Sequence, residues 1–192
     1  MGKFEFMLRK ISVQDRWRLL LAFLLFLIPS QIFRILFAFV FFARKLPREI
    51  ERGEDEILLE LPLKRWEIFV NDFLVNSSVL VVSGALSTVL LKQSRMEISK
   101  FLQIILTFPY IYGLEVLCAK YLKSNFLIPF IAFIIDISFW GTDWIYISAL
   151  SERSIFGAAI SVSVFLTAFF LYSLEDFGRE KYDRSKGSVQ EL

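Results

Sequence analysis

The sequence predicts an all-α integral membrane protein: a polytopic bundle of about five to six transmembrane helices, with an amphipathic cytoplasmic helix in one loop. Hydrophobic residues make up 56% of the 192 residues, and 22 residues are phenylalanine, which is far from the composition of a soluble domain. Long apolar segments alternate with short charged stretches. The net charge is only +2, and the basic residues cluster between the apolar segments. We therefore expect membrane lipid, and no nucleic acid, as a partner.

The residue types present exclude several kinds of chemistry. Histidine is absent and Cys118 is the single cysteine, so there is no nucleophile–histidine pair, no histidine zinc motif and no intrachain disulfide. No Gly-x-x-x-x-Gly-Lys-Ser/Thr run occurs, so the chain has no such phosphate-binding loop. An intramembrane hydrolase built on Glu115, Asp136 and Asp143 is a further alternative, but it has no recognisable nucleophile. The sequence predicts that this chain is not an enzyme and binds no cofactor or metal.

The N-terminal third contains the ambiguous part of the topology. Residues 1–16 form an amphipathic segment that can lie in the membrane interface, or a frayed cytosolic start. The apolar block 17–43 exceeds the roughly 20 residues of one span but is too short for two full spans. Pro29 divides it, so a kinked helix, a re-entrant hairpin and two short tilted helices all fit. The basic residues on both sides favour a hairpin with both ends in the cytoplasm.

Four clearer apolar blocks follow and complete a transmembrane domain over residues 17–174. They cover residues 68–91, 101–119, 126–150 and 154–174. The charge of the intervening turns places the loop before residue 68 and the tail 175–192 in the cytoplasm of a plasma-membrane protein. The tail is polar, with alternating charges and no apolar face, so we expect disorder there.

The loop between residues 44 and 67 is the only sizeable water-compatible surface inside this apolar chain. Leu46, Ile50, Ile57 and Leu61 recur at spacings of four, seven and four residues, which predicts an amphipathic helix over residues 46–61. Pro47 suits the first turn and Pro62 ends the run. Gly53, in the middle of the helix, marks a bend or a close backbone approach. The loop could bind another protein, or it could be a solvated connector between membrane helices.

The same loop resembles a known family. Glu51-Arg52-Gly53, Leu58-Leu59 and the run LPLKRWEI at 61–68, followed by an apolar helix, resemble the signature of ABC-2 type permeases, the membrane subunits of ATP-binding-cassette exporters. Glu54 stands where that family usually has threonine, and Asn71-Asp72 where it usually has Gly-Lys. The matched residues cover about a tenth of the chain, and the order of the later helices extends the resemblance to the C-terminus.

The resemblance implies a mechanism and a set of partners. The chain would be a permease subunit that dimerises with itself or with a second permease, and exports a lipophilic or other small substrate. ATP would be hydrolysed on a separate ABC ATP-binding subunit, which docks on the loop. A non-transporting membrane scaffold and a substrate-binding membrane subunit of an uptake system are the alternatives. The expected ATPase-docking residues are Leu46, Ile50, Gly53, Glu54, Ile57, Leu58, Leu61 and Pro62.

Charged residues inside the apolar blocks are the candidates for a transport path. A charge near the bilayer centre costs roughly 2.5 to 3.5 kcal/mol on insertion scales, so such residues face a partner or a watery cavity. For Asp136 a substrate or ion path and a buried structural pair are equally supported. Asp143 lies between two tryptophans, which fits either an aromatic belt or the extracellular gate that the resemblance implies. The candidates are Arg34, Asp72, Asp136 and Asp143.

Overall fold

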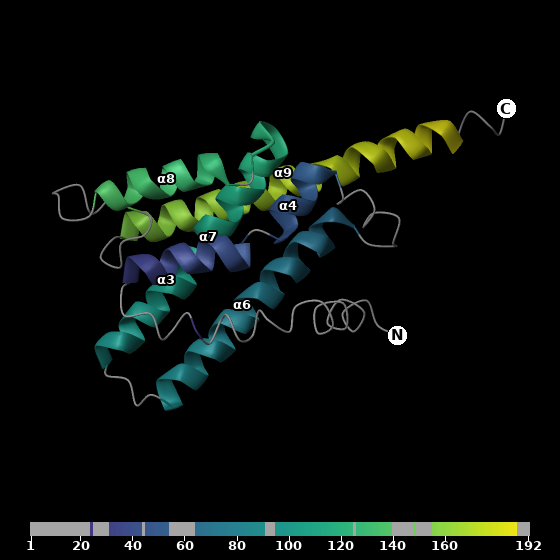
Figure 1. Ribbon diagram of the computed structural model, residues 1–192. Helices are drawn as coiled ribbons and strands as arrows, with labels where there is room; N and C mark the ends of the chain where they lie inside the picture. Colours follow the sequence, from purple (N-terminus) through teal and green to yellow (C-terminus); the bar gives the residue numbers. More distant parts are fainter. Residues whose placement is uncertain are drawn as a thin grey trace.

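The fold is helical throughout the part of the chain that is described. The computed structural model describes Leu24, residues 31–43, 45–53, 64–90, 95–124 and 126–139, Ser148, and residues 155–187 (Figure 1). Within these residues all regular structure is helical, which confirms the all-α expectation for this part of the protein. The elements are α3 (Gln31–Ala38), the π-helix η1 (Phe39–Ala43), α4 (Lys45–Arg52), α6 (Arg65–Leu90), α7 (Arg95–Leu122), α8 (Leu127–Ser138) and α9 (Ile155–Gly187).

Two of these helices are long and apolar enough to cross a membrane. The segments are Gln103–Leu122 within α7 and Phe156–Leu174 within α9. At 1.5 Å per residue each covers about 30 Å, the thickness of a bilayer's hydrocarbon core. Ile32–Phe41 and Leu127–Ser138 are apolar but shorter. The expected bundle of five to six spans therefore stays a prediction beyond these two.

Contacts between helices fix their relative directions. Along α7 and α9 the paired residues rise together, because Ser161 Oγ donates to the Leu106 carbonyl at 3.1 Å and Lys120 Nζ donates to the Leu171 carbonyl at 2.6 Å. These two helices are parallel. Between α6 and α7 the order reverses: Phe69 contacts the Tyr112 ring, and four residues later along α6 the Phe73 ring stacks on Phe108, four residues earlier along α7. Accordingly α6 begins at the end of the bundle where α7 and the apolar part of α9 finish (Figure 1).

Helices α7 and α9 approach each other closely at Gly113. A Cβ placed on this glycine would lie 2.9 Å from the Phe165 Cα and 3.1 Å from the Val164 carbonyl oxygen. Four residues earlier, Pro109 lies inside α7 and disturbs the preceding turn. The Ser161 hydroxyl donates into that turn from α9, as small polar side chains do at proline sites in apolar bundles. The glycine and the serine thus let the two backbones touch.

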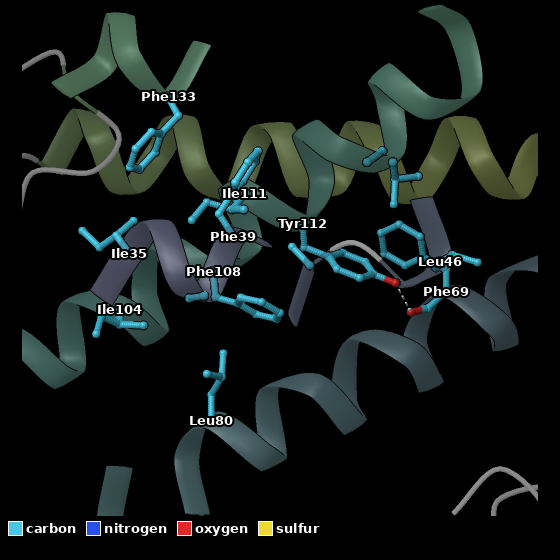
Figure 2. Close-up of a cluster of buried hydrophobic side chains, with 14 of the residues drawn as sticks. Ile35, Phe39, Leu46, Phe69, Leu80, Ile104, Phe108, Ile111, Tyr112 and Phe133 are labelled. Carbon is cyan, nitrogen blue, oxygen red and sulfur yellow. Dashed lines mark hydrogen bonds between the residues drawn. The ribbon is translucent and has the colours of Figure 1, made fainter. Parts of the chain in front are cut away.

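The hydrophobic core is centred on α7, which packs on every other helix of the described chain. Ile104, Phe108, Ile111 and Tyr112 from α7 are almost completely buried. Figure 2 shows them among side chains from α3, η1, α4, α6 and α8. The core therefore joins the short N-terminal helices to the long ones. The other labelled members are Ile35, Phe39, Leu46, Phe69, Leu80 and Phe133.

Local hydrogen bonds explain where α6 begins and α7 ends. The Glu67 carboxylate accepts a hydrogen bond from the Lys64 backbone N–H at 2.9 Å, which is half of a capping box at the start of α6. Lys123 adopts a φ of 49°, and the Ser124 N–H donates to the Cys118 carbonyl at 3.3 Å. The left-handed residue after the last turn, together with this bond back to the helix, ends α7. Both boundaries are therefore encoded locally.

Of the amphipathic helix expected over residues 46–61, the structure describes residues 46–53. Helix α4 ends at Arg52, and Gly53 has a φ of 70° with its N–H donating to the Ile50 carbonyl. Glycine reaches this left-handed conformation without the Cβ strain that other residues meet. Residues 54–63 lie outside the described part of the chain.

Two other boundaries differ from expectation. Helix α8 ends at Ser138, so only about half of the expected span 126–150 is in this helix. Helix α9 continues through Gly187, whereas disorder was expected after Leu174. Residues 1–16 and the first half of 17–43, apart from Leu24, lie outside the description.

Candidate functional site

The apolar face of α4 is turned into the protein. Leu46 is 1% exposed and belongs to the central core, and Ile50 packs against that core. Arg48, Glu51 and Arg52 are exposed. The surface that α4 offers to another molecule is therefore its charged side. Docking of an ATPase on this loop stays a prediction, and its expected contributors Glu54, Ile57, Leu58, Leu61 and Pro62 lie outside the described residues.

Helix α4 is firmly attached to the centre of the bundle. Its packing against α7 is more extensive than its packing against α6 or η1. Figure 2 shows Leu46 close to Phe69 of α6 and Tyr112 of α7. The π-helix η1 directly precedes α4, and such wider turns are frequently found at functional sites. A force applied to α4 is therefore transmitted to the helices that carry the buried polar groups.

A buried polar network lies between α6 and α7. The Tyr112 hydroxyl donates to Asp72 Oδ2 at 3.0 Å and lies 3.3 Å from the Phe69 carbonyl oxygen. Asn76 Nδ2 donates to the same Asp72 Oδ2 at 3.1 Å and to the Asp72 carbonyl at 2.9 Å. Tyr112 is 0% exposed, Asn76 1% and Asp72 9%. Asp72, one of the predicted path residues, is therefore part of a buried hydrogen-bond network with Tyr112 and Asn76.

Aromatic rings surround this network. The Tyr112 ring meets Phe69 edge-on at 5.2 Å between centroids and lies 5.4 Å from Phe73. Phe73 also lies 4.5 Å from Phe165 of α9 and stacks on Phe108 at 5.7 Å. Phe73 and Phe165 are only partly buried. The polar network is therefore walled by rings, and the wall reaches the protein surface between α6 and α9.

A second polar cluster joins the ends of three helices. The Arg65 guanidinium carbon and the Lys120 Nζ each lie 5.4 Å from the centroid of the Tyr172 ring. Lys120 also donates to the Leu171 carbonyl at 2.6 Å, and Arg65 is 5% exposed. Cations over an aromatic face are attracted to it, more strongly when they are removed from water. This cluster ties the start of α6 to the ends of α7 and of the apolar part of α9.

Arg34 and Asp136 are the other predicted path residues that the structure describes. Arg34 of α3 is 4% exposed and Asp136 of α8 is 6% exposed, so both are buried as expected for charges inside an apolar bundle. Asp143 lies outside the described residues. No group of three or more histidine, cysteine, aspartate or glutamate residues in the described ranges could hold a metal ion.

Several site residues escaped the sequence reasoning. The missed residues are Tyr112, Asn76 and Tyr172. They lie in apolar segments, where a tyrosine or an asparagine gives no indication of a functional role. The spacing of Asn76 could have indicated its contact with Asp72, because the two residues lie one helical turn apart. Tyr112 is 40 residues from Asp72, and no local pattern links the two.

Comparison of the chain with known protein families, with curated proteins and with solved structures finds no match.

Proposed function

We propose that this protein is the membrane subunit of a transporter powered by a separate ATP-hydrolysing subunit, of the type that its loop resembles. The observation that carries the proposal is the position of α4: its apolar face is held against α7, while Arg48, Glu51 and Arg52 face outward. A helix with one face in the core and one charged face exposed suits a partner that must move the bundle from outside. ATP is bound by that partner and not by this chain.

The contacts supply a route for the movement. A displacement of α4 acts on α7, and α7 is joined to α6 by the Tyr112–Asp72 hydrogen bond and to α9 by Gly113, Ser161 and Lys120. In this proposal a displacement of α4 therefore moves α6, α7 and α9 together. In this proposal the path lies among them, the protein is multi-pass in the cell membrane, and it works as a homodimer or with a second permease.

The parallel arrangement of α7 and α9 supports a multi-pass topology. If both helices span the membrane in the same direction, the chain between them must cross back once. Helix α8 has 12 residues, about 18 Å, and is too short to do so alone. In this proposal α8 forms part of the return crossing.

Cysteine labelling tests which side of the membrane carries the loop. Arg48 of α4 and Lys123 after α7 are exposed at the same end of the bundle, and the native Cys118 is 5% exposed. We expect Arg48→Cys and Lys123→Cys to react with a membrane-impermeant maleimide from the cytoplasmic side only. Phe156→Cys, at the opposite end of α9, is the control and should not react from that side. Labelling of Arg48→Cys from the outer side would refute the proposal.

Co-purification tests the partner. The protein isolated from its native membrane should carry an ATPase activity, and Arg48→Glu should lower the co-purifying activity about tenfold, equivalent to about 1.4 kcal/mol of association free energy. Lys123→Glu makes the same charge change at the same end but away from α4, and should retain the activity. An ATPase that binds equally well to Arg48→Glu would exclude α4 as the docking element. If an ATPase binds but this protein does not stimulate its ATP hydrolysis, the alternative of a non-transporting membrane scaffold would be favoured.

A further inference from the structure

Arg34 and Asp136 are buried charges that belong neither to the Tyr112–Asp72 network nor to the exposed side of α4. Arg34 of α3 is 4% exposed, and Asp136 of α8 is 6% exposed. Both lie in short apolar helical stretches, Ile32–Phe41 and Leu127–Ser138. A charge in such surroundings is costly, so buried charges are normally paired or hydrogen-bonded. Each of these two side chains therefore needs a polar partner inside the bundle.

The aromatic contacts of Phe39 give the level of α3 and η1 against α8. The Phe39 ring lies 5.9 Å from Phe126, 6.4 Å from Phe130 and 5.9 Å from Phe133, measured between ring centroids. These three rings follow one another along the first two turns of α8. Phe39 is therefore level with the middle of this series, at Phe130.

Helices α3 and α8 run in opposite directions. Figure 1 shows that α8 leads from the end of α7 back toward the end of the bundle where α9 begins, whereas α3 leads toward α4. From Phe39 back to Arg34 is about 7.5 Å along α3, and from Phe130 on to Asp136 is about 9 Å along α8, in the same direction. The two charged residues therefore come level with each other.

The same register leaves other buried carboxylates at a different level of the bundle. Figure 2 shows Ile35, the neighbour of Arg34, close to Ile104 of α7. Glu115 lies eleven residues further along α7, about 16 Å away. Asp72 is hydrogen-bonded to Tyr112, which is only one turn short of Glu115. Among the acidic side chains that the structure describes as buried, Asp136 is thus the one placed beside Arg34.

We infer that Arg34 and Asp136 form a buried ion pair that fastens α8 to α3. The long arginine side chain reaches across the layer of phenylalanine rings, and its planar guanidinium matches the two carboxylate oxygens. Of the two roles open to Asp136 from the sequence, the inference selects the structural pair. In the proposed function, on which this last step rests, the pair adds α8 to the helices that a displacement of α4 moves.

Thermal unfolding of the full chain in detergent tests the pair. Arg34→Met and Asp136→Leu should each lower the unfolding temperature by about 5 °C or more, because each leaves the opposite charge buried alone. The double variant removes both charges and should unfold near the native temperature, since apolar residues of similar volume replace buried ion pairs well. If the single variants fail to fold, recovery of a folded double variant gives the same support. A double variant that loses as much stability as the two single changes combined would overturn the inference.

Cross-linking tests the distance directly. Arg34→Cys with Asp136→Cys, in a Cys118→Ser background, should be joined by a short bismaleimide, detected by mass spectrometry of the digested protein. Phe33→Cys with Ile135→Cys is the matched control, because these neighbours are 61% and 53% exposed and should cross-link far less. Equal cross-linking of the two pairs would contradict the inference. Neither measurement involves an ATPase, so a negative result leaves the docking tests of the proposed function standing.

Discussion

Replacing Gly113 with leucine is expected to separate α7 from α9 and to destabilise the fold by about 3 kcal/mol or more, since side chains forced into packed interiors displace the backbone. Even a methyl group at this position would lie 2.9 Å from the Phe165 Cα, a backbone atom that cannot swing away. Alanine normally gains about 1 kcal/mol over glycine inside a helix. A net loss of stability in Gly113→Ala would therefore show that the close approach outweighs helix propensity.

The measurement is thermal unfolding of the purified protein in detergent, followed by circular dichroism. Ala159→Leu provides the matched control, because Ala159 is exposed on α9 and a surface substitution usually changes stability by less than about 0.5 kcal/mol. Equal unfolding temperatures for Gly113→Leu and the native chain would contradict the backbone contact between α7 and α9.

Replacing Tyr112 with phenylalanine is expected to cost about 1–2 kcal/mol of stability. The ring keeps its contacts with Phe69 and Phe73, while Asp72 Oδ2 loses the hydroxyl donor at 3.0 Å. Hydrogen bonds to charged groups contribute about 1.5–3 kcal/mol in water-soluble proteins, whereas those between helices in membranes average about 0.6 and reach about 1.7 kcal/mol. The expected loss of about 1–2 kcal/mol for Tyr112→Phe lies between these two ranges, because the hydrogen bond joins a charged group to a neighbouring helix.

A double-mutant cycle with Asp72→Ala isolates the bond itself, because alanine has no acceptor for the Tyr112 hydroxyl. If Tyr112 and Asp72 interact, the cost of Tyr112→Phe should shrink in the Asp72→Ala background. Tyr121→Phe is the control, since Tyr121 is 56% exposed and its change should be nearly silent. Additive effects in the cycle would mean that the Tyr112–Asp72 bond does not hold α6 against α7.

The positions of the long helices were predictable because composition alone determines them. The blocks expected at 68–91 and 101–119 correspond to α6 and α7. Helix α6 begins three residues before its block, and α7 begins six residues before and ends three residues after its block, in stretches that mix charged and apolar residues. Lys64 with Glu67 could be read from the sequence as a capping box variant only after the helix start was known. The fold class thus follows from hydrophobicity, and the exact ends follow from local hydrogen bonds.

The candidate site was predictable only in part. Asp72 stands out in any apolar sequence, but its partner Tyr112 depends on the antiparallel packing of α6 and α7, which no local pattern reveals. The sequence predicted a bend or a close backbone approach at Gly53, and the structure shows a positive φ of 70° there. The apolar positions of the loop helix fitted an external partner as well as the protein's own core, and Leu46 proves to be buried inside.

The uninterrupted length of α9 has a mechanical consequence. Its 33 residues form a rod of about 50 Å, and the stretch from Phe165, where it crosses α7, to Gly187 measures about 33 Å. A rocking motion of about 10° at the crossing would sweep the far tip through about 6 Å. A small rearrangement among tightly packed side chains at the crossing would therefore displace the end of α9 far enough to alter its contacts with a neighbouring molecule outside the bilayer.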